Sequence, residues 1–127
     1  MDEKQEKALC VIKPDGVRRH LTHTVMQALL DEGLEIVALY PVTMTQVEAE
    51  KLYEAHRGAH YFDGQISFMT SGPSVVVAVE GINCSQRLRH VVKSLRAEFG
   101  QSVRENVVHG SDSFEAGIRE TEIFFPS

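Results

Sequence analysis

The segment SVVVAVEG, residues 74–81, constrains the fold more than any other part of the chain. It is apolar and rich in β-branched residues, and apolar and polar positions do not alternate along it. A strand of this kind is typically covered on both faces. We therefore expect it at the centre of a sheet with further layers on both sides. A chain of 127 residues with 43% hydrophobic composition suffices for this arrangement, and we take residues 1–127 as a single domain.

Shorter patterns predict the elements around this strand. The apolar run ALCVI is a buried strand stopped by the turn residues of KPDG, and LEIVALYPVTM is a second β-rich run. Helical spacing of apolar residues predicts helices over residues 22–32, 45–56 and 83–95, the second opened by a capping box of Thr45 and Glu48. HRGAHYFDGQ is expected to be a connection and TEIFF the last strand. This alternation indicates one layered α/β or α+β structure.

The charge and the cysteine content restrict the function and the compartment. A net charge of −5 argues against a protein that coats nucleic acid or an anionic membrane, because such proteins need a broad basic field; a local basic pocket is still compatible. No apolar run approaches the length of a membrane span, and no apolar segment follows the charged N-terminus as in an export signal. Cys10 and Cys84 lack a CxxC spacing and are interpreted as reduced thiols. We expect a cytoplasmic protein.

Several common phosphate-binding and catalytic motifs are missing from the sequence. It has no GxxxxGK[ST] and no GxGxxG, which excludes P-loop and Rossmann chemistry, and it has no GxSxG nucleophile elbow. The pairs His20 with His23 and His56 with His60 have no Cys or carboxylate at a metal-binding spacing. Solvated surface histidines are the favoured interpretation of these two pairs.

The segment NVVHGSDSFEA, residues 106–116, places His109 at the end of an apolar run and before small polar residues. This histidine is either a buried structural imidazole at the turn into a helix or a nucleophile within reach of a substrate. Lys13 directly follows an apolar strand, where ligands are often held, although a solvated turn lysine is the simpler interpretation. Arg89 and Arg96 are seven positions apart and share one helical face. These cations indicate an anion site only in combination with His109.

Four segments occur in order along the chain: IKPDGV, SGP followed by the valine-rich strand, ENVVHGSDS and a closing IFF. In this combination the chain resembles the nucleoside diphosphate kinase family over residues 7–126. The resemblance implies an α+β fold, in which a four-stranded antiparallel sheet has a ferredoxin-like βαββαβ arrangement with flanking helices. It also implies an enzyme that transfers the γ-phosphoryl group of a nucleoside triphosphate, typically ATP, to a nucleoside diphosphate.

By the same resemblance, His109 is the nucleophile and becomes phosphohistidine in a ping-pong reaction. An imidazole is substantially unprotonated near neutral pH, so it can attack phosphorus without a dedicated base. Gly110 would keep bulk away from the attack path. Ser111 and Glu120 would support the site, with Glu120 accepting a hydrogen bond from the ring nitrogen that does not attack.

The resemblance further implies a nucleotide site made of cations and a slot for the base. The residues that match phosphate-binding cations of the family are Lys13, Arg89 and Arg96, and Mg²⁺ would arrive with the nucleotide phosphates. Asn106 matches a residue that contacts the sugar, and Tyr61 and Val103 match the two sides of the base slot. Tyr53 matches a tyrosine near the histidine, although core packing explains it equally well. Stacking ignores base identity, so all common nucleoside di- and triphosphates are expected substrates.

The match departs from the family between Arg89 and Arg96, where only HVVKSL intervenes. The family carries a longer loop there, with a threonine that touches a phosphate, and Ser94 is not assigned its role. Because that loop helps subunits meet in family hexamers, a homodimer through the sheet and helix surface is preferred over a hexamer. Two alternatives to an active kinase stay open: a nucleotide-binding or regulatory relative with impaired turnover, and a structural interaction module that merely packs the histidine.

Overall fold

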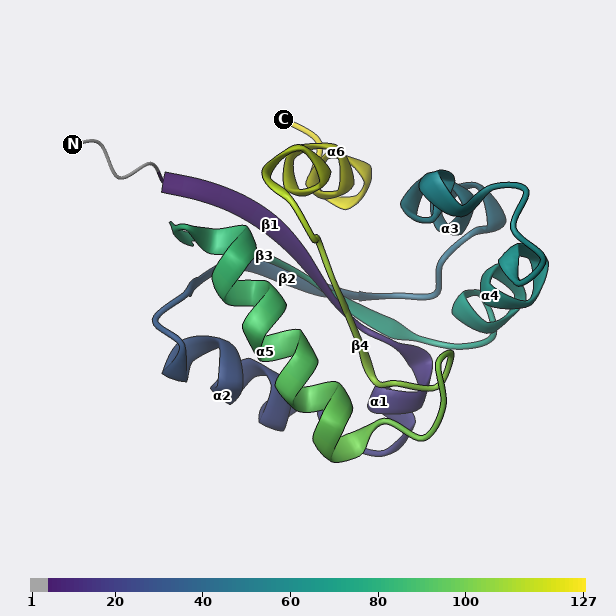
Figure 1. The fold of residues 1–127 in the computed structure, drawn as a ribbon, viewed down its shortest axis with the longest axis horizontal. Helices are drawn as coiled ribbons and strands as arrows, with labels where there is room; N and C mark the ends of the chain where they lie inside the picture. The colour runs from purple at the N-terminus through teal and green to yellow at the C-terminus, as the bar shows by residue number, and fades with distance from the viewer. Residues whose placement is uncertain (1–4) are drawn as a thin grey trace.

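The structure is a computed structural model that describes residues 5–127. It contains a four-stranded antiparallel sheet in the order β2-β3-β1-β4 (Figure 1). The strands are β1 (Gln5–Ile12), β2 (Glu35–Val42), β3 (Ser74–Ile82) and β4 (Val108–Gly110). The helices are α1 (Pro14–Arg18), α2 (Thr22–Asp31), α3 (Gln46–Leu52), α4 (Phe62–Met69), α5 (Cys84–Phe99) and α6 (Phe114–Phe124), with a 3-10 helix η1 (Glu54–His56). This topology confirms the predicted ferredoxin-like α+β fold.

Strand β3 lies between β1 and β2, as its sequence predicted. Val77 pairs with Cys10 of β1 and with Leu39 of β2. Side chains of β3 enter two separate apolar layers: Val77 and Val79 pack with α2 and α5, whereas Val76 packs with α3, α4 and α6. Figure 1 shows these two groups of helices on opposite faces of the sheet. Burial on both faces explains why the strand has no polar alternation.

Two predictions in the first half of the chain need correction. KPDG does not form a turn, because Pro14 is the first residue of α1; the fixed φ of proline suits this position, where no N–H donor is needed. HRGAHYFDGQ is not entirely a connection, because α4 begins at Phe62 within it. Phe62, Ile66 and Met69 recur at helical spacing and are buried, and this pattern extends beyond the quoted segment. The capping box of Thr45 and Glu48 is confirmed.

The prediction of a last strand at TEIFF is wrong, because its first four residues are the last turn of α6 and Phe125 is the C-cap. The side chain of Ser113 accepts a hydrogen bond from the N–H of Ala116 and caps the helix. Gly117, Thr121 and Phe124 then recur at helical spacing on the buried face. The fourth strand is the three-residue segment around His109, too short to be recognised from alternation.

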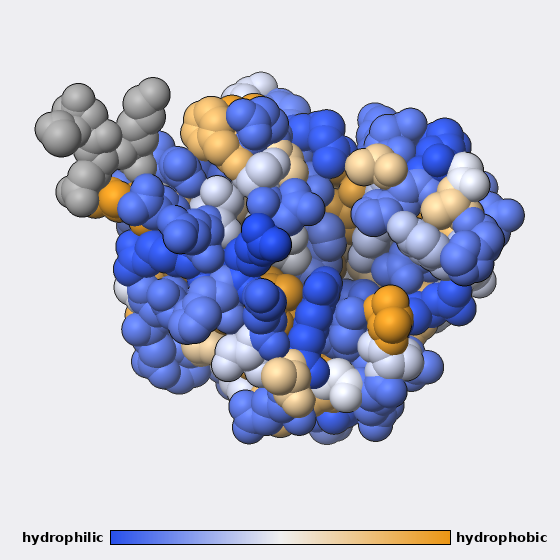
Figure 2. All heavy atoms as spheres, viewed as in Figure 1, coloured by the Kyte–Doolittle hydropathy of each residue, from blue (hydrophilic) through white to orange (hydrophobic). Residues whose placement is uncertain are grey.

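The surface on the side shown in Figure 2 is mostly hydrophilic, with small separate apolar areas. It is hollowed between the side that carries α5 and β4 and the side that carries α3 and α4. In the part of the chain that the structure describes, no helix is long and apolar enough to cross a membrane. The hollow beside β4 is where the candidate site residues gather.

Gly117 allows α6 to approach β1 closely, and replacing it should destabilise the fold. A Cβ atom at this position would overlap the carbonyl oxygen of Lys7, which is backbone and cannot move aside cheaply. Although alanine is the better helix former, we expect Gly117→Ala to lower the free energy of unfolding by roughly 1–3 kcal/mol, as overpacking typically does. Urea denaturation measures this change.

Gly72→Ala is the matched control, because a Cβ built on Gly72 has no described residue other than its chain neighbours within 4 Å. Its free energy of unfolding should stay within about 0.5 kcal/mol of the parent. Equal stabilities of the two variants would show that α6 does not need a glycine against β1.

Candidate active site

A hollow of about 460 Å³ beside β4 collects most of the residues that the sequence singled out. Seven predicted residues line it: Lys13, Tyr53, Tyr61, Arg96, Val103, Asn106 and His109. Ser111 and Glu120 are buried behind His109, whereas Arg89 borders an adjoining hollow. Four other residues complete the lining: His56, Gln65, Gly110 and Asp112. Asp112 belongs to the HGSDS motif, but no sequence signal marked Gln65.

His109 is held by one ring nitrogen, which leaves the other available. It lies in the middle of β4 and pairs with Val11 of β1. Its Nε2 is 2.9 Å from Oε1 of Glu120, a buried carboxylate on α6. Within residues 5–127, no hydrogen bond involves Nδ1. The carboxylate therefore fixes the orientation of the ring, and Nδ1 is the nitrogen that a substrate can reach.

Ser111 connects this pair to the sheet. Its Oγ accepts a hydrogen bond from the N–H of Leu9 at 3.0 Å and donates one to Oε1 of Glu120 at 2.9 Å. Arg119 donates to the other carboxylate oxygen at 3.4 Å. Both oxygens of the buried carboxylate thus have partners, as a buried charge requires. Ser111 therefore belongs to this buried network, whereas Ser113 caps α6.

Lys13 is a buried cation, not a solvated turn lysine. Only 1% of its surface is exposed, and its Nζ donates to the carbonyl oxygen of Arg104 at 2.7 Å and to Oδ1 of Asn106 at 2.8 Å. Burial and, less strongly, the charge of Arg96 lower the pKa of Lys13 from 10.5 to about 8. An ammonium group has three donors, so one remains for a ligand.

The segment before His109 is held in an unusual conformation. Val107 has a φ of +77°, which is strained for a β-branched residue. Its N–H donates to Oδ2 of Asp15 at 3.0 Å, and its carbonyl oxygen accepts from the N–H of Lys13 at 2.8 Å. These two bonds fasten the segment to the start of α1. As a result, Asn106 and His109 on either side of Val107 are both placed in the hollow.

Helix α5 runs without interruption through both predicted arginines. The Nε of Arg96 donates to the carbonyl oxygen of Val108 at 3.0 Å, and burial lowers the pKa of the Arg96 guanidinium. Gly110 faces this helix: a Cβ atom there would lie 2.7 Å from Cγ2 of Val92. The glycine is therefore needed for the contact between β4 and α5, and the sequence-based reason, an open attack path, is not the one that the structure gives.

Tyr61 and Val103 form the outer part of the hollow. They are 41% and 95% exposed, so both can contact a flat ligand from solvent. Asn106 lies below Val103 and donates from Nδ2 to its carbonyl oxygen at 2.7 Å. Deeper in the site, the Tyr53 ring packs edge-on against His109 at 5.5 Å between centroids. Burial raises the pKa of Tyr53 to about 12, so its phenol stays neutral near pH 7.

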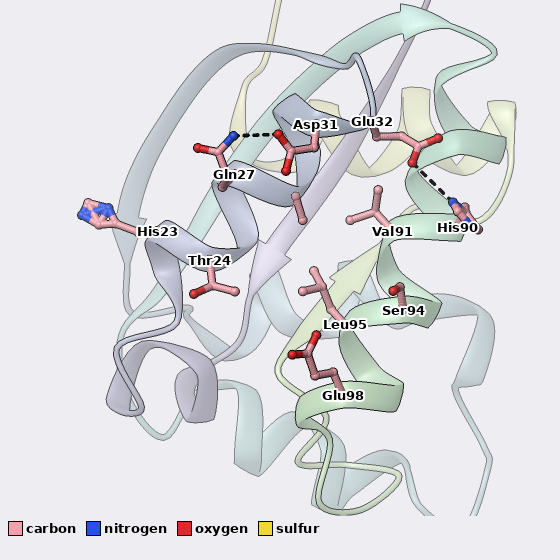
Figure 3. A pocket seen from close by; sticks show the side chains of 11 residues that line it. His23, Thr24, Gln27, Asp31, Glu32, His90, Val91, Ser94, Leu95 and Glu98 are labelled. Atoms are coloured by element: carbon pink, nitrogen blue, oxygen red, sulfur yellow. Dashed lines mark hydrogen bonds and ion pairs between the residues drawn. The ribbon is translucent and has the colours of Figure 1, made fainter.

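A larger hollow, of about 670 Å³, lies elsewhere, between α2 and α5 (Figure 3). Its charged lining includes the carboxylates of Asp31, Glu32 and Glu98, and no Lys or Arg from the described part of the chain contributes to it. In Figure 3, Gln27 bonds Asp31 and His90 faces Glu32, so these polar groups are partly paired already. A polyanion would be repelled there, and we assign no ligand to this hollow.

The hollow beside β4 thus combines a free imidazole nitrogen, an orienting carboxylate, the buried cation Lys13 and the half-buried cation Arg96 on a ferredoxin-like fold. This set suits an enzyme that handles phosphoryl groups, because such transfer needs a nucleophile and positive charge more than other covalent help.

Comparison with known proteins defines the family. The family model described as nucleoside diphosphate kinase matches residues 6–127. The chain belongs to the nucleoside diphosphate kinase family. It is 38% identical to the nucleoside diphosphate kinase of Fervidobacterium nodosum, with 94% of this chain and 88% of the relative covered. It is 39% identical to that of Methylobacterium radiotolerans, with 94% and 93% covered. It also superposes on the Aquifex aeolicus nucleoside diphosphate kinase with a TM-score of 0.90, at 28% identity and with 96% of each chain covered.

The lowered pKa of Lys13 predicts a titration in an unusual pH range. We expect the Lys13 ammonium to lose its proton with a midpoint near pH 8, which ¹³C-lysine NMR can follow with Lys13→Met to assign the signal. Between pH 8 and 10.5 the unfolded chain binds this proton and the folded chain does not. The contribution of Lys13 to the free energy of unfolding therefore rises with pH in this window. A midpoint at 10.5 or above would contradict the buried environment.

Proposed function

We propose that the chain is an active nucleoside diphosphate kinase that carries the phosphoryl group on Nδ1 of His109. The observation that carries the proposal is the pairing of Nε2 with buried Glu120 while Nδ1 is left for the hollow that Lys13 and Arg96 line. Membership of the family supports the same conclusion. We also propose that the protein works in the cytoplasm.

The reaction would proceed in two matched steps. In the first, the lone pair of Nδ1 attacks the γ-phosphorus, the bond from phosphorus to the bridging oxygen breaks, and the nucleoside diphosphate leaves with that electron pair. In the second, a terminal oxygen of another nucleoside diphosphate attacks the same phosphorus and the N–P bond breaks. Throughout, Glu120 holds the proton on Nε2 and stabilises the positive charge that the ring gains.

Positively charged side chains would bind the phosphates and stabilise the transferring group. Lys13 and Arg96 bind the oxygens of the transferring group, and Arg89 binds the phosphate chain from the adjoining hollow. The base lies between Tyr61 and Val103, and the sugar lies against Asn106. In this slot an aromatic and an aliphatic side chain contact the faces of the base, which suits purines and pyrimidines equally.

The site fits Mg²⁺ as a companion of the nucleotide but not as a resident ion. Hard cations prefer several oxygen ligands. The only carboxylate lining the hollow in the described part of the chain is Asp112, and Oδ1 of Asn106 already accepts from Lys13. Phosphate oxygens would supply most ligands, with Asp112 in reach. When bound, Mg²⁺ would neutralise charge on the phosphates.

A nucleotide-binding or regulatory relative with impaired turnover is the second candidate. One observation favours it: α5 continues where the family has a longer loop, so no loop closes over the phosphates between Arg89 and Arg96. The intact set of His109, Glu120 and Lys13 speaks for turnover, because binding alone needs neither a nucleophile nor its orienting carboxylate.

We propose a homodimer through the free edge of the sheet. Strand β2 is the edge strand opposite β4, and its backbone groups on that side are not paired within residues 5–127. Val37 and Leu39 on β2 are exposed, as is Leu30 at the end of α2. An exposed edge with apolar side chains is a site where a second copy can pair and bury apolar surface.

The first test of the function is transfer of label. The wild-type protein, incubated with γ-labelled ATP and Mg²⁺, should acquire acid-labile, base-stable label and pass it to GDP. His109→Ala should acquire none, and Glu120→Gln should transfer roughly 10- to 100-fold more slowly, because the ring loses its orienting charge.

Circular dichroism and urea denaturation of His109→Ala provide the control, and both should resemble those of the wild type. Nucleotide binding without any label in the wild type would favour the second candidate. Label that persists in His109→Ala would place the nucleophile elsewhere.

The dimer is tested by sedimentation velocity. The wild type should sediment at twice the chain mass of 14.2 kDa, and Leu39→Lys should shift it toward the monomer, because a charge would be buried without a partner. Val47→Lys is the control, since Val47 is exposed on α3 and is not part of the sheet. A wild-type hexamer, or an unchanged dimer in Leu39→Lys, would refute this interface.

A further inference from the structure

Lys93 shares a helical face with the two arginines of α5. Arg89, Lys93 and Arg96 occupy positions i, i+4 and i+7 of one unbroken helix. Such residues lie above one another, with a rise of about 1.5 Å per residue. All three border the same hollow of about 340 Å³. The continuity of the helix therefore creates a row of three cations.

This row is continuous with the site of His109. The hollow along α5 and the hollow beside β4 have Arg96, Gly110 and Asp112 in common. A chain of phosphates that reaches Nδ1 of His109 can thus extend past Arg96 toward Lys93. The route is open, because Lys93 and Arg89 are both exposed.

The charge of Lys93 is not used within the described protein. Among residues 5–127, no carboxylate lies within 4.0 Å of its ammonium group and no hydrogen bond involves it. Arg57, by comparison, bonds Glu54 and lies 3.6 Å from Glu50. Of the residues that the structure describes, Asp112 is the only carboxylate that lines the hollow along α5. Positive charge therefore exceeds negative charge in this hollow.

We infer that Lys93 is a further phosphate-binding residue for the nucleoside triphosphate. The inference rests on the proposed function, because it takes the polyphosphate to lie between His109 and α5. A triphosphate carries about four negative charges near neutral pH, more than the three cations Lys13, Arg89 and Arg96 neutralise. An ammonium group on a flexible stem supplies a mobile charge with three donors, which suits phosphate oxygens at slightly different positions.

The experiment compares the binding of a non-hydrolysable ATP analogue, and the steady-state kinetics with ATP and GDP, across four proteins: wild type, Lys93→Ala, Lys93→Arg and Lys51→Ala. Lys51 is the matched control, because it is an exposed helical lysine outside both hollows. Lys93→Ala should weaken binding of the analogue and raise the KM for ATP by roughly five- to tenfold, the cost of one charge-assisted hydrogen bond.

Three further readouts separate a phosphate contact from a general effect of charge. The loss in Lys93→Ala should be smaller for AMP than for the ATP analogue, and smaller at high salt. Lys93→Arg should stay close to the wild type. Lys51→Ala should change none of these values more than about twofold.

The possible outcomes distinguish the inference from the proposed function. If the wild type turns over and Lys93→Ala behaves like Lys51→Ala, the role of Lys93 is refuted and the kinase function stands. If the wild type binds nucleotide but does not transfer phosphate, and Lys93→Ala still weakens binding, the phosphate contact stands and the kinase function is refuted. If the wild type binds no nucleotide, both are refuted.

Discussion

The two backbone bonds on Val107 are the constraint on which the site depends. They join the end of β1 to the start of β4 through the N–H of Lys13 and the carboxylate of Asp15. A φ of +77° at a valine costs of order 1–3 kcal/mol and persists only where the surroundings determine it. The same few residues bury Lys13 and place Asn106 beside it. Strain, cation and nucleophile are therefore parts of one local structure.

The side of the site behind His109, its inner wall, is buried and hydrogen-bonded, whereas the side in front of it, its outer wall, is exposed to solvent. Behind His109, each polar group has a fixed partner, from Leu9 through Ser111 to Glu120. In front of it, Tyr61 and Val103 are exposed. A rigid inner wall sets the direction of the imidazole, which chemistry requires to be accurate. An outer wall made of one exposed aromatic and one exposed aliphatic side chain can contact flat ligands of different shapes.

The sequence predicted features that local patterns determine. The central strand followed from its apolar, valine-rich run, and the capping box of Thr45 and Glu48 followed from a four-residue motif. Burial of Lys13 could not be predicted, because its partners are more than ninety residues away in sequence. TEIFF was misread as a strand because its β-prone residues outweighed a helical pattern that began earlier, at Ser113. The site residues were identified through the resemblance to a family. Local patterns by themselves gave only separate cations and a histidine with two possible roles.

The continuity of α5 also affects how much of the main chain has to move when a ligand binds. A loop that closes over a ligand must be ordered at each binding event, and its opening can limit product release. Here Arg89 and Arg96 are carried by hydrogen-bonded helix, so a ligand at this wall immobilises side chains while the main chain is already in place. The rate of nucleotide exchange should then depend on how quickly the side-chain contacts to phosphate break, and not on the opening of a loop.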